Sequence, residues 1–163
     1  MYKVLNIGGK DYHLEYSIEA SLYADCVESI TYIFSGASAE EDEELTRKER
    51  IKEMFSSMAN LPKTTLTVFY AGLLEAHGIC GDATVPDIAT AKELIKQYIT
   101  EHKDDDTGNF YGIFNICAEQ MAEDGFFKLI GLEAMTAQGE EAEAKQPKVP
   151  QDHKKKTTKV SEK

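Results

Sequence analysis

One apolar stretch, residues 61–78, most constrains what this chain can fold into. Between positions 66 and 74 only Thr67 is clearly polar, and large apolar side chains recur at the spacing of one helix face. Pro62 suits the first turn of a helix, and Gly78 suits the left-handed residue just past its end. We therefore predict a helix at the centre of a bundle, too short for a membrane span of about 20 apolar residues. Its buried side chains should be Leu66, Phe69, Tyr70, Leu73 and Leu74, with Val68, Ala71 and Gly72 around the sides.

Five further segments carry apolar residues at helical spacing and complete a bundle of five to six helices. They are residues 18–36, 45–60, 88–99, 110–123 and 126–138. The first should be capped by Ser17 and bury a stripe of Ile18, Leu22, Cys26, Ile30, Ile33 and Phe34. Thr84 should open the helix at 88–99, with Asp87 in its first turn, and Asp124 and Gly125 should end the helix at 110–123. Residues 36–44 should form a mobile loop and 103–109 a polar turn.

The two ends of the chain differ from this helical middle. Residues 2–7 and 10–16 are rich in Val, Ile, Tyr and Leu and flank Gly8 and Gly9, which predicts an N-terminal β-hairpin. Residues 139–163 contain no aromatic residue and many charged ones, so they cannot bury enough apolar area to offset the entropy of ordering. The chain should therefore be a mainly α domain at 1–138 with a disordered charged tail at 139–163.

Charge is distributed unevenly between these two parts. Residues 1–138 hold 24 Asp and Glu against 11 Lys and Arg, a net charge of −13, whereas 139–163 carry +2. An acidic body repels nucleic acid and anionic membranes, so neither is an expected partner. No secretory signal opens the chain, and three widely spaced cysteines suit reduced thiols better than a disulfide framework. These features indicate a cytosolic protein.

Two clusters invite a metal reading. The acidic run 104–106 followed by Gly108 fails the spacing of a calcium loop, because the invariant glycine position falls on Asn109. His77 and Cys80 have the spacing of two zinc ligands, but no second pair with ligand spacing occurs. We therefore expect no metal site in this chain.

Other catalytic and binding signatures are weak. No Gly-rich phosphate loop follows a strand, and no histidine lies in a motif with a nucleophile. The sequence thus predicts a protein that is not an enzyme, with no catalytic or cofactor-binding residues and with partner-binding residues that it does not identify. Phe126 and Phe127 should clamp the last helix to the body, although they could also form an exposed docking patch.

Several short blocks support a more specific reading. They occupy positions 6–12 (NIGGKDY), 17–20 (SIEA), 69–74 (FYAGLL), 109–112 (NFYG) and 123–127 (EDGFF). Over residues 2–135 the chain resembles the tail assembly chaperones of long-tailed, siphovirus-type bacteriophages and prophages of Gram-positive bacteria. These blocks are packing and turn motifs rather than catalytic ones.

The resemblance implies a helper made in the host cell cytoplasm and absent from the mature virion. Such proteins bind the tape measure protein and assist polymerisation of the major tail tube protein around it, and self-association is possible. An apolar groove on a helical body can hold amphipathic helices of this kind. The alternative is a small acidic regulatory or anti-host protein that binds a basic host factor, and an enzyme ranks third.

The resemblance also implies two products of different length, made by programmed ribosomal frameshifting. Three adjoining lysine codons, at 154–156, could supply the slippery run of adenines. The same lysines could equally form a soluble terminus that does nothing else. The gene sequence separates the two, since slippage needs codons that re-pair and an open overlapping frame.

Overall fold

The computed structural model describes residues 2–38 and 47–133, and it confirms a mainly helical fold with an N-terminal antiparallel hairpin. The elements are β1 (Lys3–Ile7), β2 (Lys10–Leu14), α1 (Ile18–Leu22), α2 (Ala24–Ser38), α3 (Arg47–His77), α4 (Ile88–Glu101), α5 (Phe110–Glu123) and α6 (Phe126–Leu129). The predicted tail at 139–163, its lysine run and most of the predicted loop at 36–44 lie outside the described residues.

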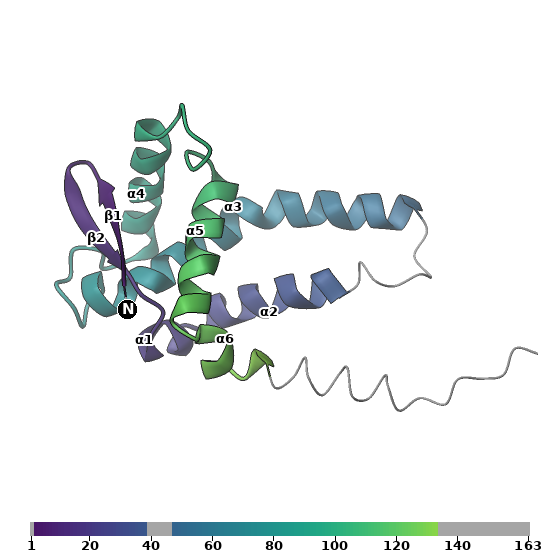
Figure 1. The fold of residues 1–163 in the computed structure, drawn as a ribbon, viewed down its shortest axis with the longest axis horizontal. Coiled ribbons are helices and arrows are strands. Elements are labelled where there is room, and N and C mark those ends of the chain that lie inside the picture. Colours follow the sequence, from purple (N-terminus) through teal and green to yellow (C-terminus); the bar gives the residue numbers. More distant parts are fainter. Residues whose placement is uncertain (1, 39–46, 134–163) are drawn as a thin grey trace, which may run out of the picture.

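Helix α3 is the central element, and α1, α2, α4, α5 and β2 all pack against it. Figure 1 shows the hairpin, α4 and α5 gathered around one part of α3, while α2 and the N-terminal part of α3 run side by side away from this body. Phe69 and Leu73 are buried as predicted, and so are Val68 and Ala71, which we expected at the sides. Because α3 has neighbours in several directions, its burial is not confined to one stripe. Leu66, Tyr70 and Leu74 are half-buried.

The predicted helix boundary at Pro62 is wrong. Residues 45–60 and 62–77 do not form two helices, because α3 continues through Pro62. A proline within a helix leaves the carbonyl four residues earlier without its N–H donor. Pro62 itself is exposed and so lies on the water side of the helix, where the lost backbone bond costs less than it would in the core.

The end of α3 also differs from expectation. Gly78 is not left-handed: its N–H donates to the Leu74 carbonyl at 3.0 Å and continues the helical pattern past His77. The residue with positive φ in the following turn is Ala83, at +55°. At Gly125, by contrast, the predicted end of α5 is confirmed, with φ at +68°.

The predicted first helix at 18–36 is two helices. Tyr23 is extended (ψ 95°), so the chain changes direction between α1 and α2. Cys26 and Ile30 on α2 are buried as predicted, but Ile18 and Leu22 on α1 are 65% and 73% exposed. The predicted stripe is therefore wrong for α1, because the break turns the two faces apart. On α2 it is correct for Cys26 and Ile30, Ile33 is half-buried, and the side chain of Phe34 lies outside the described part of the structure.

Helix caps follow the predicted chemistry with one shift in position. Ser17 caps α1 by accepting from the Glu19 N–H at 3.2 Å, as expected. Helix α4 starts at Ile88 rather than at Thr84, and its cap is Asp87, which accepts from the Thr90 N–H at 2.8 Å. Helix α6 ends at Leu129, earlier than the predicted segment 126–138, of which 134–138 lie outside the described residues.

The hairpin closes on α3 at a glycine. Gly8 and Gly9 both have positive φ (+64° and +75°), as a two-residue hairpin turn requires. At the other end of the hairpin the Glu15 N–H donates to the Gly72 carbonyl at 2.8 Å. A Cβ on Gly72 would lie 2.5 Å from the Leu14 side chain, so only a glycine allows this approach.

Replacing Leu73 by alanine tests the central position of α3. Leu73 is fully buried, so Leu73→Ala should lower the free energy of unfolding by about 2–5 kcal/mol in urea titrations. Ile79, which is 77% exposed, offers the control, and Ile79→Ala should change that free energy by less than about 0.5 kcal/mol. A loss below about 1 kcal/mol for Leu73→Ala would contradict the packing described above.

Candidate functional site

A buried histidine lies where α3 ends and meets the hairpin. His77 Nε2 accepts a hydrogen bond from the His13 N–H at 2.9 Å, so the ring proton must reside on Nδ1. That nitrogen faces Asp82 Oδ2 and Thr84 Oγ1, both at 3.1 Å. The pair of Asp82 and His77 has the outline of a catalytic dyad, but the nitrogen that would accept a substrate proton is already occupied. The pair therefore joins the hairpin to the loop after α3.

These contacts also bear on the zinc spacing of His77 and Cys80. Both ring nitrogens of His77 have hydrogen-bond partners, whereas Cys80 is exposed. Within the described parts of the chain, no three His, Cys, Asp or Glu side chains are placed to hold a metal ion. In the acidic run 104–106, Asp105 accepts from the Thr107 N–H at 2.9 Å and lies 2.9 Å from His102 Nδ1, which organises a turn.

The Asp82 carboxylate is the most perturbed acid in this region. Hydrogen bonds from the Thr84 hydroxyl (2.6 Å) and the Thr84 N–H (2.9 Å), and then from His77, lower the pKa of Asp82 to about 2. These donors prefer the ionised form, so the carboxylate stabilises the folded state above its ordinary pKa of 3.8. That contribution is lost as the pH falls towards 2.

The buried thiols are placed for packing. Cys26 and Cys117 are buried as predicted, and burial raises the pKa of each thiol to about 12. Nearby, the buried Tyr16 hydroxyl donates to the Val68 carbonyl at 3.0 Å, and burial raises its pKa well above 10. Because the thiolate is the reactive form of cysteine, neither buried thiol is a nucleophile at neutral pH.

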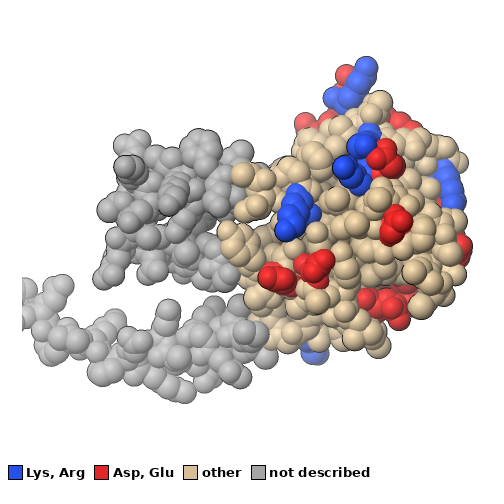
Figure 2. Space-filling view, turned by 180° about the vertical axis from the view of Figure 1, so that it is seen from behind, with Lys and Arg blue, Asp and Glu red and all other residues tan. Residues whose placement is uncertain are grey.

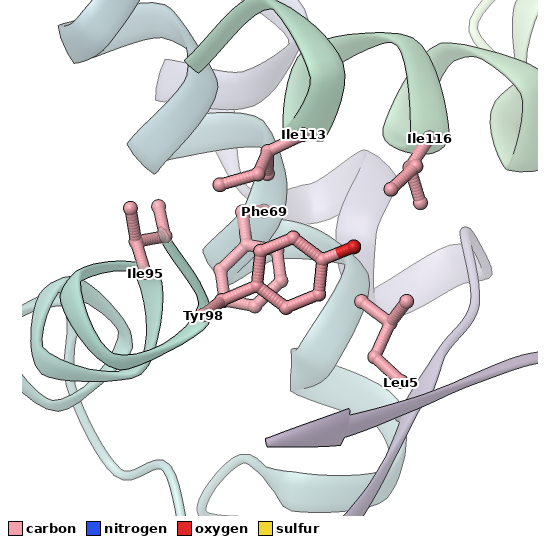
Figure 3. A pocket seen from close by; sticks show the side chains of 6 residues that line it. All are labelled: Leu5, Phe69, Ile95, Tyr98, Ile113 and Ile116. Atoms are coloured by element: carbon pink, nitrogen blue, oxygen red, sulfur yellow. The ribbon is translucent and has the colours of Figure 1, made fainter. Parts of the chain in front are cut away.

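An apolar crevice crosses the core between β1, α3, α4 and α5. Figure 3 shows six side chains converging on it from these elements. They are Leu5, Phe69, Ile95, Tyr98, Ile113 and Ile116. The crevice leaves no room for a water-sized molecule, and the Tyr98 hydroxyl points to Thr107 Oγ1 at 3.2 Å. It is a seam of the packed core rather than a binding pocket.

The surface is mixed in charge on the side seen in Figure 2. Lys and Arg side chains lie among Asp and Glu side chains there, with uncharged residues between them. This face therefore offers no continuous basic stripe of the kind that binds nucleic acid. In the described parts of the chain, no helix has the length and apolarity needed to cross a membrane.

The candidate functional site is an exposed surface on α1. On α1, Ile18 and Leu22 lie one turn apart and project away from Ala20, which is buried. On α2, Asp25, Glu28 and Tyr32 share an exposed face at helical spacing, and Tyr32 is 53% exposed. We call the two exposed apolar residues of α1, Ile18 and Leu22, the outer face; the exposed residues of α2 lie beyond the break at Tyr23. Large apolar side chains in contact with water suit binding of a protein partner.

Sequence periodicity missed this surface. Ile18 and Leu22 continue the spacing of the buried α2 residues, so they read as core, and only the break at Tyr23 reveals otherwise. The expected clamp after Gly125 is confirmed at Phe126, which is fully buried with its ring centroid 5.5 Å from that of Tyr16. Phe127 is half-buried. Other large apolar side chains with high exposure are Tyr2, Val4, Ile79, Ile88, Tyr111 and Leu129.

Comparisons with protein-family models, with curated proteins and with solved structures find no match to this chain.

A titration of the Asp82 carboxyl by NMR tests the hydrogen bonds that join His77, Asp82 and Thr84 at the end of α3. Its pKa should be about 2, and it should rise towards 3.8 in Thr84→Val because the strongest of its hydrogen bonds is lost. Thr90→Val is the matched control: it removes the hydroxyl that bonds Asp87 at 2.8 Å and should leave the pKa of Asp82 unchanged. An Asp82 pKa near 3.8 in the unaltered protein would contradict the geometry.

Proposed function

We propose that this protein is a tail assembly chaperone of a siphovirus-type phage or prophage. In this role it binds the tape measure protein in the host cytoplasm, assists polymerisation of the major tail tube protein around it, and is left out of the mature virion. The sequence blocks described above suggest this family. The observation that carries the proposal is the exposure of Ile18 and Leu22, at 65% and 73%, one turn apart on the same short helix.

Most of the resembling blocks lie at positions that shape the fold. Residues 69–74 lie in the buried C-terminal part of α3, and 123–127 span the turn between α5 and α6. Residues 6–12 surround the hairpin turn, and 109–112 begin with Asn109, the cap of α5. Two blocks also include an exposed large apolar side chain: Ile18 on the outer face in 17–20, and Tyr111 in 109–112. The resemblance therefore concerns mainly residues that shape the fold, and exposed residues must provide the contacts with the partner protein.

The surface chemistry suits the proposed task. A tape measure protein exposes amphipathic helices before the tube encloses them, and exposed apolar helix surface promotes aggregation. A helix face with large aliphatic side chains can cover such a stripe by helix-to-helix packing. The contact is non-covalent, and in the proposed role the tube protein takes the place of the chaperone on the tape measure protein.

A small acidic regulatory or anti-host protein remains the second candidate. The net charge of −11 favours it, since an acidic protein attracts a basic host factor at long range. The two candidates differ in what holds the partner. Apolar packing dominates in the chaperone, and charge dominates in the regulator.

Co-purification with the tape measure protein at two salt concentrations tests the proposal. We expect the complex to persist between about 0.1 M and about 1 M salt, although the Debye length shrinks from about 10 Å to about 3 Å over this range. Ile18→Ser combined with Leu22→Ser should reduce recovery of the tape measure protein, while Ile79→Ser should not. If the tape measure protein co-purifies at neither salt concentration, the chaperone proposal is rejected. Capture of a basic host protein at low salt alone would support the regulator.

A further inference from the structure

We propose that His77 makes the contact between the hairpin and α3 sensitive to pH. When its ring takes up a second proton, the hydrogen bond to β2 breaks, while the contact with the loop after α3 becomes stronger. This inference goes beyond the proposed function and does not depend on it. It follows from the partners that the two ring nitrogens face.

The neutral ring of His77 matches its partners on both sides. Nε2 offers a lone pair and accepts from the His13 N–H at 2.9 Å. Nδ1 therefore carries the ring proton, and it lies 3.1 Å from both Asp82 Oδ2 and Thr84 Oγ1. The Thr84 hydroxyl donates its own proton to Asp82 Oδ1 at 2.6 Å, so both oxygens near Nδ1 are acceptors. The neutral form with its proton on Nδ1 satisfies all of these groups.

A second proton on the ring has one place to go, which is Nε2. The charged imidazole donates from both nitrogens, whereas a backbone N–H cannot accept. Protonated Nε2 and the His13 nitrogen would then face each other as two donors, at a separation of 2.9 Å. The ring or the strand must move away, and the hydrogen bond to β2 is lost in either case.

The other side of the ring gains from the same proton. Hydrogen bonds from Thr84, and then the contact with His77, lower the pKa of Asp82 to about 2, so its carboxylate is ionised at neutral and mildly acidic pH. An imidazolium is attracted to that carboxylate, which lies 3.1 Å from Nδ1. Protonation therefore weakens the attachment of the ring to the hairpin and strengthens its attachment to the loop after α3.

The groups that the hairpin places near the ring do not replace the lost bond. They are Tyr2, Lys10, Tyr12 and His13. The ring centroids of Tyr12 and His13 lie 5.2 Å and 5.8 Å from that of His77. Tyr2 stacks on the His13 ring, and Lys10 Nζ lies over the Tyr12 ring. Tyrosine supplies no negative charge near neutral pH, and a lysine or a protonated histidine repels an imidazolium. Because His77 is only 5% exposed, water replaces little of the missing hydrogen bond.

The structural change should be a local loosening of β2. Two backbone N–H groups attach this side of the hairpin to α3: that of His13 bonds the imidazole, and that of Glu15 bonds the Gly72 carbonyl at 2.8 Å. A carbonyl does not titrate, so the second bond persists. At the turn, the Gly8 N–H donates to the Glu101 carboxylate at 3.0 Å. The hairpin is thus held at both ends while the segment around His13 is released.

Hydrogen exchange measured by NMR on the full chain tests the inference. Between pH of about 7.5 and about 5, where histidine takes up its second proton, the protection factor of the His13 amide should fall about tenfold or more. The protection factor of the Glu15 amide should change by less than about twofold. Nitrogen-15 shifts of the His77 ring should show Nε2 unprotonated at the upper pH and protonated at the lower.

Three variants identify the group that titrates. His77→Gln retains an oxygen that can accept from the His13 N–H but takes up no proton, so the protection of that amide should no longer depend on pH. His102→Gln is the matched control, because His102 is also paired with an aspartate, Asp105 at 2.9 Å, and the response should remain. His13→Phe removes the neighbouring imidazole, leaves the backbone N–H in place, and should also retain the response.

Four results would overturn the inference. They are a His77 ring that stays neutral down to a pH of about 5, a protonated ring with unchanged protection of the His13 amide, an equal fall in protection at Glu15, and a pH response that survives in His77→Gln or disappears in His13→Phe. Circular dichroism at both pH values checks that each variant is folded. If His77→Gln does not fold, the titration of the ring and the two amides in the unaltered protein still decides the question.

Discussion

The close approach of the hairpin to α3 at Gly72 is the contact on which the rest of the arrangement depends. A two-stranded hairpin is marginal in water and must pack against something. Here Leu14 and Tyr16 reach the α3 backbone because residue 72 has no side chain, and a Cβ there would lie 2.9 Å from the Tyr16 ring. The same approach brings the Glu15 N–H to the Gly72 carbonyl and the Tyr16 hydroxyl to the Val68 carbonyl.

This contact determines how α1 begins. With Tyr16 fixed between α3 and Phe126, its N–H donates to Asp124 at 2.8 Å. The next residue, Ser17, donates its hydroxyl to Glu75 of α3 at 2.5 Å while it caps α1. The hairpin thus sets the direction in which α1 starts, whereas α2 runs in a different direction, along α3. The break at Tyr23 reconciles the two directions, and the exposure of Ile18 and Leu22 is its result.

Sequence patterns predicted the features of the fold that depend on residues close together in the chain. The Gly8 and Gly9 turn, the stripes of α4 and α5, the Ser17 cap and the end of α5 depend on residues within a few positions of each other, so periodicity and capping chemistry suffice. The continuous α3 and the break at Tyr23 depend on contacts between distant segments. Pro62 favours the start of a helix, but it is exposed and the helix continues through it. Tyr23 packs edge-on against Tyr70, 47 positions later, with ring centroids 5.5 Å apart. The candidate site could not be predicted because it exists only where that break turns apolar residues outward.

The uninterrupted course of α3 has a mechanical consequence. With 31 residues the helix is about 46 Å long, and it belongs both to the packed body and to the pair of helices that leaves it (Figure 1). Two helices joined by a pliable turn at Pro62 would let the outer pair swing independently. A continuous helix instead connects the two parts by backbone hydrogen bonds along most of its length, so a sideways displacement of the outer pair is passed along α3 to the body.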